Sequence, residues 1–108
     1  MQNKTFEKCK ILLELSKLLE LLENNKSYPF INFIDMIIEN GGACISIIFK
    51  DNATFKNMQN FYNNDLLVLL KLFNKNFIKI EFDYAGINLN IEGIDELDYR
   101  EYIEFIGY

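Results

Sequence analysis

The chain has 108 residues, half of them hydrophobic, and a formal net charge of −5 at pH 7. This composition provides one hydrophobic core and excludes intrinsic disorder, so we expect a single α+β domain over residues 1–108. No apolar stretch reaches the roughly 20 residues that a membrane-spanning helix needs, no secretory signal is visible, and the absence of histidine excludes imidazole-based catalysis and histidine-ligated metals.

The first predicted element is a helix from Thr5 to Glu23, capped by Thr5 or Asn3. One broad apolar stripe recurs at helical spacing, which is typical of a helix embedded in its own core. It consists of Ile11, Leu12, Leu15, Leu18, Leu19 and Leu22. Three further apolar residues fall on the opposite side of the helical wheel: Phe6, Leu13 and Leu21. Either the rest of the fold covers them, or they form the exposed seam of a homodimer.

A second helix is predicted between Ser27 and Asn40. Ser27 is a good N-cap, and Pro29 fits the first turn because its missing N–H would be unpaired there in any case. The run Asn40-Gly41-Gly42 would end the helix, since glycine accepts the left-handed conformation found at helix C-termini. Five apolar side chains share one face of this helix: Phe30, Phe33, Ile34, Ile37 and Ile38.

Two further elements follow in the middle of the chain. The segment from Ala43 to Lys50 is rich in β-branched and aromatic residues, which predicts a buried strand. From Thr54 to about Asn76 we expect a helix, broken near Asn63-Asn64, with Asp65 capping its second piece. Residues 66–73 are apolar nearly all around the helical wheel, which is typical of a central helix, although a strand is the alternative for so short an apolar run.

The clearest element is a hairpin formed by residues 77–84 and 87–92 around Ala85-Gly86. Apolar and polar residues alternate along both arms, so one face is apolar and the other polar. A longer loop in the same register is the alternative to a tight turn, because Ala85 does not favour positive φ. The expected register places Tyr84 opposite Ile87, Phe82 opposite Leu89, Ile80 opposite Ile91 and Lys79 opposite Glu92.

The last segment predicts a short C-terminal helix. Acidic residues at 95–98 are typical of a helix N-terminus, and Tyr99, Tyr102, Ile103 and Ile106 follow at helical spacing. A strand is the alternative, because residues 102–106 are rich in β-formers. The predicted order is therefore α-α-β-α-β-β-α, with the helices packed on one face of a small, mainly antiparallel sheet.

Motifs for catalysis or cofactor binding are absent from the sequence. Cys9 and Cys44 are too few for a structural zinc site and lie in predicted regular elements, where reduced thiols behave as small hydrophobes, so we expect a cytoplasmic protein without metal. No glycine-rich nucleotide-binding motif occurs. Glu81, Asp83 and Glu92 share the polar face of the hairpin, but strand alternation requires polar residues there whatever their function. We expect no catalytic residue, no cofactor and no enzymatic activity.

The charges are distributed unevenly along the chain. From Ile80 to the last residue there are eight acids and one base, a net of −7, whereas residues 1–79 carry ten bases and eight acids, a net of +2. The acids are densest between Glu92 and Tyr108, where they alternate with tyrosines. Tyrosines are frequent anchors at binding hot spots, and the carboxylates supply a negative field. The candidate partner-binding residues are Glu92, Asp95, Glu96, Asp98, Tyr99, Glu101, Tyr102 and Glu104.

These features predict a non-enzymatic inhibitor or regulator that docks its acidic surface on a basic site of a partner protein, such as a nucleic-acid-binding cleft. Direct nucleic-acid binding is disfavoured, because phosphates need Lys and Arg, and no membrane partner is expected. Phage anti-defence proteins, including anti-CRISPR proteins, and immunity proteins against nuclease toxins are of this type, although no motif matches a particular family. Three alternatives stay open: an acidic face that only maintains solubility, a structural or adaptor subunit that dimerises through the first helix, and a carboxylate- or metal-dependent enzyme that uses Glu81, Asp83 and Glu92.

Overall fold

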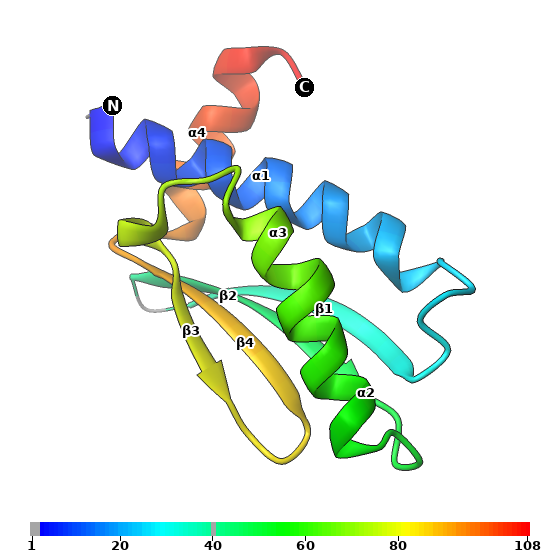
Figure 1. Cartoon of the computed structure of the whole chain (residues 1–108). Helices are drawn as coiled ribbons and strands as arrows, with labels where there is room; N and C mark the ends of the chain where they lie inside the picture. Colours follow the sequence, from blue (N-terminus) through cyan, green and yellow to red (C-terminus); the bar gives the residue numbers. More distant parts are fainter. Residues whose placement is uncertain (1–2, 40) are drawn as a thin grey trace.

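The computed structural model describes residues 3–39 and 41–108, which form one antiparallel sheet in the order β1-β2-β4-β3 with the helices on one of its faces (Figure 1). The strands are β1 (Ile31–Glu39), β2 (Gly42–Phe49), β3 (Lys79–Phe82) and β4 (Gly86–Glu92). The helices are α1 (Asn3–Glu23), α2 (Phe55–Asn60), α3 (Leu67–Leu70) and α4 (Glu96–Ile106). A π-helical turn (Phe61–Leu66) joins α2 to α3, and a 3-10 turn (Lys75–Phe77) precedes β3.

The expected α+β class is confirmed, as are the first and last helices and the strand after residue 42. Thr5 lies inside α1 rather than at its cap, and the side chain of Asn3 lies outside the described part of the structure. None of the helices in the described residues is both long and apolar enough to cross a bilayer.

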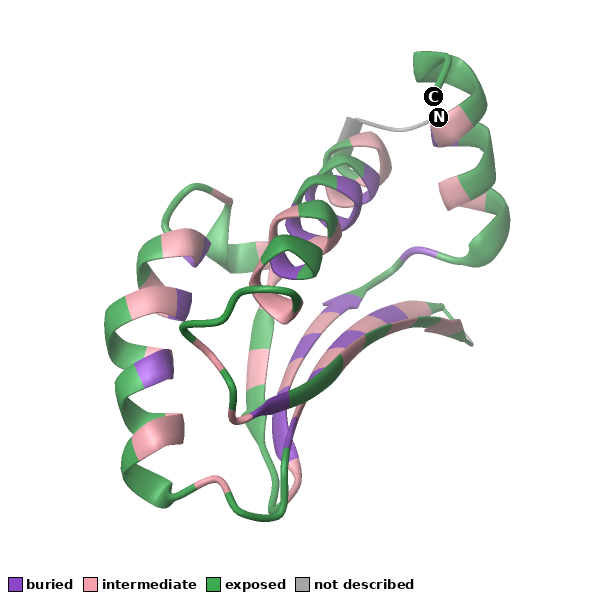
Figure 2. Ribbon diagram, turned by 90° about the vertical axis from the view of Figure 1, so that its right-hand side faces the viewer, coloured by how far each residue is buried: buried purple, intermediate pink, exposed green. Residues whose placement is uncertain are grey.

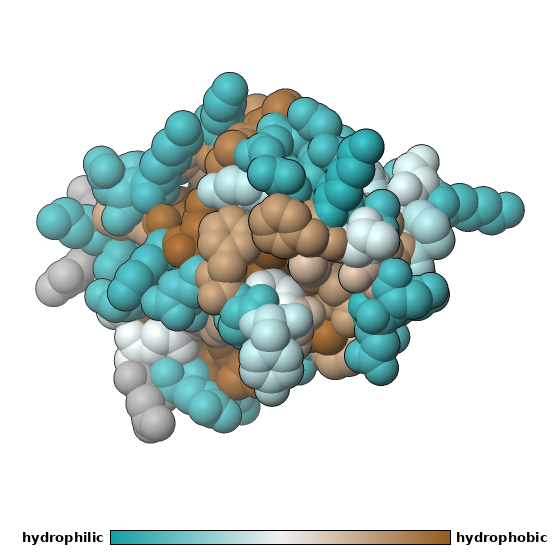
Figure 3. All heavy atoms as spheres, turned by 60° about the horizontal axis from the view of Figure 1, so that its bottom comes forward, coloured by the Kyte–Doolittle hydropathy of each residue, from teal (hydrophilic) through white to brown (hydrophobic). Residues whose placement is uncertain are grey.

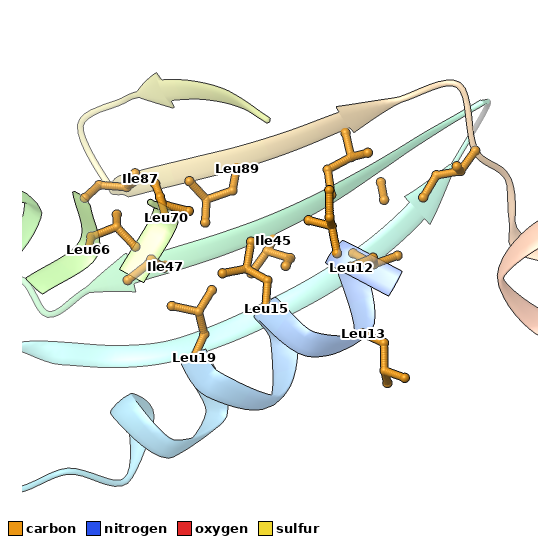
Figure 4. Packing of buried hydrophobic residues seen from close by; sticks show 14 of the residues in the cluster. Leu12, Leu13, Leu15, Leu19, Ile45, Ile47, Leu66, Leu70, Ile87 and Leu89 are labelled. Carbon is orange, nitrogen blue, oxygen red and sulfur yellow. The ribbon is translucent and has the colours of Figure 1, made fainter. Parts of the chain in front are cut away.

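The core lies between the sheet and the helices. Along β2 buried side chains alternate with half-buried ones, as the two-residue period of a strand requires. Leu12, Leu15 and Leu19 of α1 point toward the sheet (Figure 4), and all three are fully buried. Each such side chain stabilises the fold by about 1.5–3 kcal/mol relative to its exposed state. The same cluster includes Ile45, Ile47, Leu66, Leu70, Ile87 and Leu89.

The prediction of a helix between residues 27 and 40 was wrong, because residues 31–39 form strand β1. The expected helical face is divided between the two sides of the sheet, because Ile34 is half-buried while its neighbours Phe33 and Ile37 are exposed. Isoleucine is stiff at its branched Cβ and fits the pleated surface of a strand better than a helix. Pairing with β2 satisfies the backbone groups on the side of β1 that faces the sheet, with a register shift between Ile31 and Phe33.

The glycines that were expected to end this helix lie instead at the β1–β2 connection. Glu39 faces Gly42 across the ladder, and Gly41 has a φ of 81°. An Asn-Gly pair between apolar runs favours a hairpin turn with positive φ as much as it favours a helix end. Asn40 itself lies outside the described residues.

The predicted third helix is present but neither central nor broken. It starts after Thr54, whose side chain accepts a hydrogen bond from the N–H of Asn57 at 3.0 Å. At the expected break the chain stays helical and widens into the π turn, with no cap by Asp65. The helix ends at Leu70, and Val68 and Leu72 are exposed, so it covers the sheet with one side and faces solvent with the other (Figure 2).

The predicted hairpin is present, but its register differs by two residues. Phe82, not Tyr84, lies opposite Ile87. A shift of two keeps the same residues on the same face, because side chains alternate with period two. Lys79 therefore loses its expected partner Glu92, and it forms an ion pair with Glu81 on its own strand at 3.3 Å.

Candidate protein-binding surface

The acidic segment at the end of the chain begins with a capping box. The N–H of Asp98 donates to the Asp95 carboxylate at 2.9 Å, and the N–H of Asp95 donates to the Asp98 carboxylate at 3.0 Å. Both carboxylates also lie at the positive end of the helix dipole. Two of the predicted partner-binding acids therefore fix the start of α4, which confirms the predicted cap.

The inner side of α4 packs on α1 and contains the two predicted tyrosines. Tyr102 is only 4% exposed, and its ring meets the edge of Phe6 at a centroid distance of 5.0 Å. Tyr99 is half-buried. Tyr102 thus belongs to the core and cannot reach a partner unless α4 moves, as its helical spacing already indicated.

The packing of α4 on α1 also covers part of the second face of α1. Phe6 is half-buried against α4, and Leu13, which points away from the sheet, is 7% exposed (Figure 4). Of the three residues proposed as a dimer seam, Leu21 alone is exposed. The fold itself covers Phe6 and Leu13, as expected for a helix embedded in its own core.

The outer side of α4 carries carboxylates beside large apolar side chains. Glu101 and Glu104 are exposed, and exposed fractions are 64% for Leu97 and 69% for Tyr108. Leu97, Glu101 and Glu104 have the spacing i, i+4, i+7 that places side chains on one helical face. Tyr108 follows the helix, because Gly107 ends α4 in the left-handed conformation, and the Nζ of Lys17 lies 4.1 Å from the centroid of its ring. Phe105 lies beside the outer face, 74% exposed. Leu97, Phe105 and Tyr108 were not among the predicted site residues, although the helical wheel could have identified Leu97 and Phe105 once the buried side was known.

The protein neutralises few of these charges itself. Glu96 forms an ion pair with Arg100 at 2.6 Å. Within residues 3–39 and 41–108, the remaining predicted acids have no lysine or arginine at ion-pair distance. The charge of Glu92 is offset in part by lysines, because Glu92 lines the same hollow as Lys8 and Lys79 at the end of β4. The surface that stays negative is therefore the outer side of α4.

The buried thiol of Cys9 responds to the same negative potential. Burial, followed by the nearby carboxylates of Asp98 and Asp95, raises its pKa from 9.0 to about 11. Burial likewise raises the pKa of Tyr102, with the Glu14 carboxylate adding to the effect. The thiol is consequently protonated at neutral pH and is not a nucleophile.

The hairpin carboxylates have structural roles. Asp83 accepts hydrogen bonds from the N–H groups of Ala85 at 2.7 Å and Gly86 at 2.9 Å, which forms the turn. The side-chain amide of Asn88 donates to it as well, and these hydrogen bonds, that of Asn88 foremost, lower the pKa of Asp83. No three Cys, Asp or Glu side chains in the described part of the chain are grouped as metal ligands would be.

Three comparisons with known proteins complete the description of this surface. No protein-family model, no curated protein and no solved structure matches the chain. The assignment of a function therefore depends on the geometry and charge of the residues described above.

Proposed function

We propose that the protein is a non-enzymatic inhibitor or regulator that docks the outer side of α4 on a basic site of a partner protein. The observation that carries the proposal is the pair of exposed, unneutralised carboxylates of Glu101 and Glu104 beside the exposed side chains of Leu97 and Phe105. Carboxylates attract a positive partner over distance, and large apolar side chains supply the contact area that holds it.

The structure narrows the proposed contact set relative to the sequence. Asp95 and Asp98 are occupied with the capping box, and Glu96 is paired with Arg100. These groups still add to the negative potential, because hydrogen bonding and pairing with one arginine leave the segment acidic overall. Direct contact is proposed for Glu101 and Glu104, and the remaining carboxylates contribute long-range attraction.

The experiment compares two charge reversals of equal size. The variant Glu101→Lys/Glu104→Lys changes the outer side of α4, and Asp51→Lys/Glu81→Lys changes two exposed acids elsewhere by the same amount. Each protein is immobilised, proteins retained from a host lysate are identified, and the dissociation constant of the purified partner is measured at two salt concentrations. Wild type and Asp51→Lys/Glu81→Lys should bind with similar affinity that falls with salt, whereas Glu101→Lys/Glu104→Lys should lose at least tenfold.

Two results would contradict the proposal. If both double variants keep the wild-type partner and affinity, the acidic surface serves solubility alone. If the retained partner is itself acidic, the attraction proposed here has the wrong sign.

A further inference from the structure

A groove lies between the α2 helix and the tip of the β3–β4 hairpin, on the face shown in Figure 3. Its volume is about 560 Å³, within the range of small-molecule sites. The π-helical turn supplies part of one wall, and such turns are frequent at functional sites. The apolar lining consists of Phe49, Phe55, Met58, Tyr62, Phe82 and Ile87.

The aromatic rings around this groove are exposed to an unusual degree. Exposed fractions are 75% for Phe55, 60% for Phe82 and 101% for Tyr84, and all three line the same hollow. Figure 3 shows apolar side chains gathered in the middle of this face and surrounded by hydrophilic ones. Isolated exposed apolar residues are ordinary, but a cluster around a hollow marks a binding site.

The walls of the groove are fixed before any ligand arrives. Tyr62 and Phe82 meet edge to face at a centroid distance of 4.8 Å, which joins the helix to the hairpin. The capping box of Thr54 and Asn57 fixes the start of α2, and the hydrogen bonds to Asp83 fix the hairpin tip. A preformed site loses little conformational entropy on binding.

The charge of the groove favours one class of ligand. Its lining contains the Asp83 carboxylate and no lysine or arginine. Aromatic faces carry negative partial charge and attract cations, most of all cations with apolar substituents, which give up little hydration. An anion would meet both the ring faces and Asp83 with the wrong sign.

We propose that this groove binds a small organic cation, an ammonium group carrying apolar substituents, with the rings of Phe55, Tyr62, Phe82 and Tyr84 around it and Asp83 as its counter-charge. A volume of about 560 Å³ lies within the range of small-molecule sites, so the proposed ligand is a free small molecule. This site is independent of the α4 surface and lies at the opposite end of the molecule in Figure 1.

The test uses three probes with the same phenyl ring and a head group of similar size: phenyltrimethylammonium, neutral 2-phenylpropan-2-ol and anionic benzenesulfonate. Each is titrated into the purified full chain, and binding is followed by amide chemical shifts in NMR spectra. The cation should bind most tightly, about 2- to 30-fold more tightly than the neutral probe, and should shift residues of α2 and the hairpin tip. The anion should not bind.

Matched variants locate the site. Phe82→Leu should weaken phenyltrimethylammonium binding severalfold, whereas Phe105→Leu, which changes another exposed phenylalanine on α4, should leave it unchanged. Asp83→Asn should reduce the preference for the cation over the neutral probe. Because Asp83 also accepts the hydrogen bonds of the hairpin tip, the amide spectrum of this variant without ligand checks that the tip keeps its structure. Both phenylalanines are exposed, so neither change should prevent folding.

Three results would overturn the proposal. The first is equal or tighter binding of the neutral probe, which would make the groove an apolar site without charge preference. The second is no binding of any probe at millimolar concentrations. The third is an equal loss with Phe82→Leu and Phe105→Leu, which would place the cation elsewhere.

Discussion

At the α4 end of the molecule the exposed aromatic rings lie among carboxylates on the convex surface of a helix, whereas at the hairpin end they surround a hollow with one carboxylate. The two ends also differ in support. Helix α4 packs chiefly on α1, while the groove is built from the sheet and a long helical segment together. Convex charge attracts a macromolecule over distance, and a preformed hollow selects a ligand by shape. The two proposed sites therefore differ in kind, although they rest on one small core.

The largest expected effect is at the hairpin end, where β4 approaches β2 closely. A Cβ added at Gly86 would lie 1.9 Å from the Ile47 carbonyl oxygen. Backbone atoms cannot move aside cheaply, so Gly86→Ala should lower the free energy of unfolding by at least about 3 kcal/mol. Urea denaturation measures this. Gly42→Ala is the control, because its Cβ would meet the Ile91 oxygen at an ordinary 3.6 Å. If both variants lose the same free energy of unfolding, the backbone around Gly86 can move aside, and the close approach of β4 to β2 is not rigid.

The second prediction examines the α4 end through Cys9. Its pKa is raised from 9.0 to about 11 in the folded state, so the unfolded chain loses this proton first as the pH rises. The stabilisation is fully present below pH 9 and is lost as the pH passes through about 11, a total of roughly 2–3 kcal/mol. Denaturation of wild type and Cys9→Ala between pH 7 and 12 measures it. If the free energies of unfolding of wild type and Cys9→Ala change with pH in the same way, the folded state does not raise the pKa of the Cys9 thiol.

The fold could be predicted wherever one periodicity dominated. The stripe of α1, the β-branched and aromatic residues of β2 and the acidic cap of α4 each predict one element, and all three are observed. The prediction for residues 31–39 failed, because an edge strand with apolar residues on both faces shows no alternation of apolar and polar side chains. Ile34 lies on one side and Ile37 on the other, and both also fit a helical stripe.

The candidate sites could be predicted only in part. The acidic segment is contiguous in sequence, so charge alone located it, but deciding which side of α4 faces solvent required its packing on α1. The groove is formed by Phe49, Phe55 and Phe82, which lie on three separate elements. No local pattern joins them, because only the tertiary fold brings them around one hollow.

The smallest predicted effect concerns the start of α4. Asp95→Ala removes the acceptor for the Asp98 N–H and should lower the free energy of unfolding by about 1 kcal/mol. Glu101→Ala, which removes a carboxylate that caps nothing, should change it by less than about 0.5 kcal/mol. Thermal denaturation at neutral pH compares the two. If Glu101→Ala is the more damaging, the division between structural and free carboxylates on α4 is wrong.

The strand order has a consequence for how the chain comes together. Residues 42–48 of β2 pair with residues 86–92 of β4, so one long side of β2 has no neighbour until the intervening helical segment has been synthesised. At roughly 5–20 residues per second on the ribosome, that interval lasts a few seconds. The β1–β2 hairpin can form in this time, because its pairing is local. A nascent chain halted before residue 86 would present an open apolar strand to its neighbours and should aggregate.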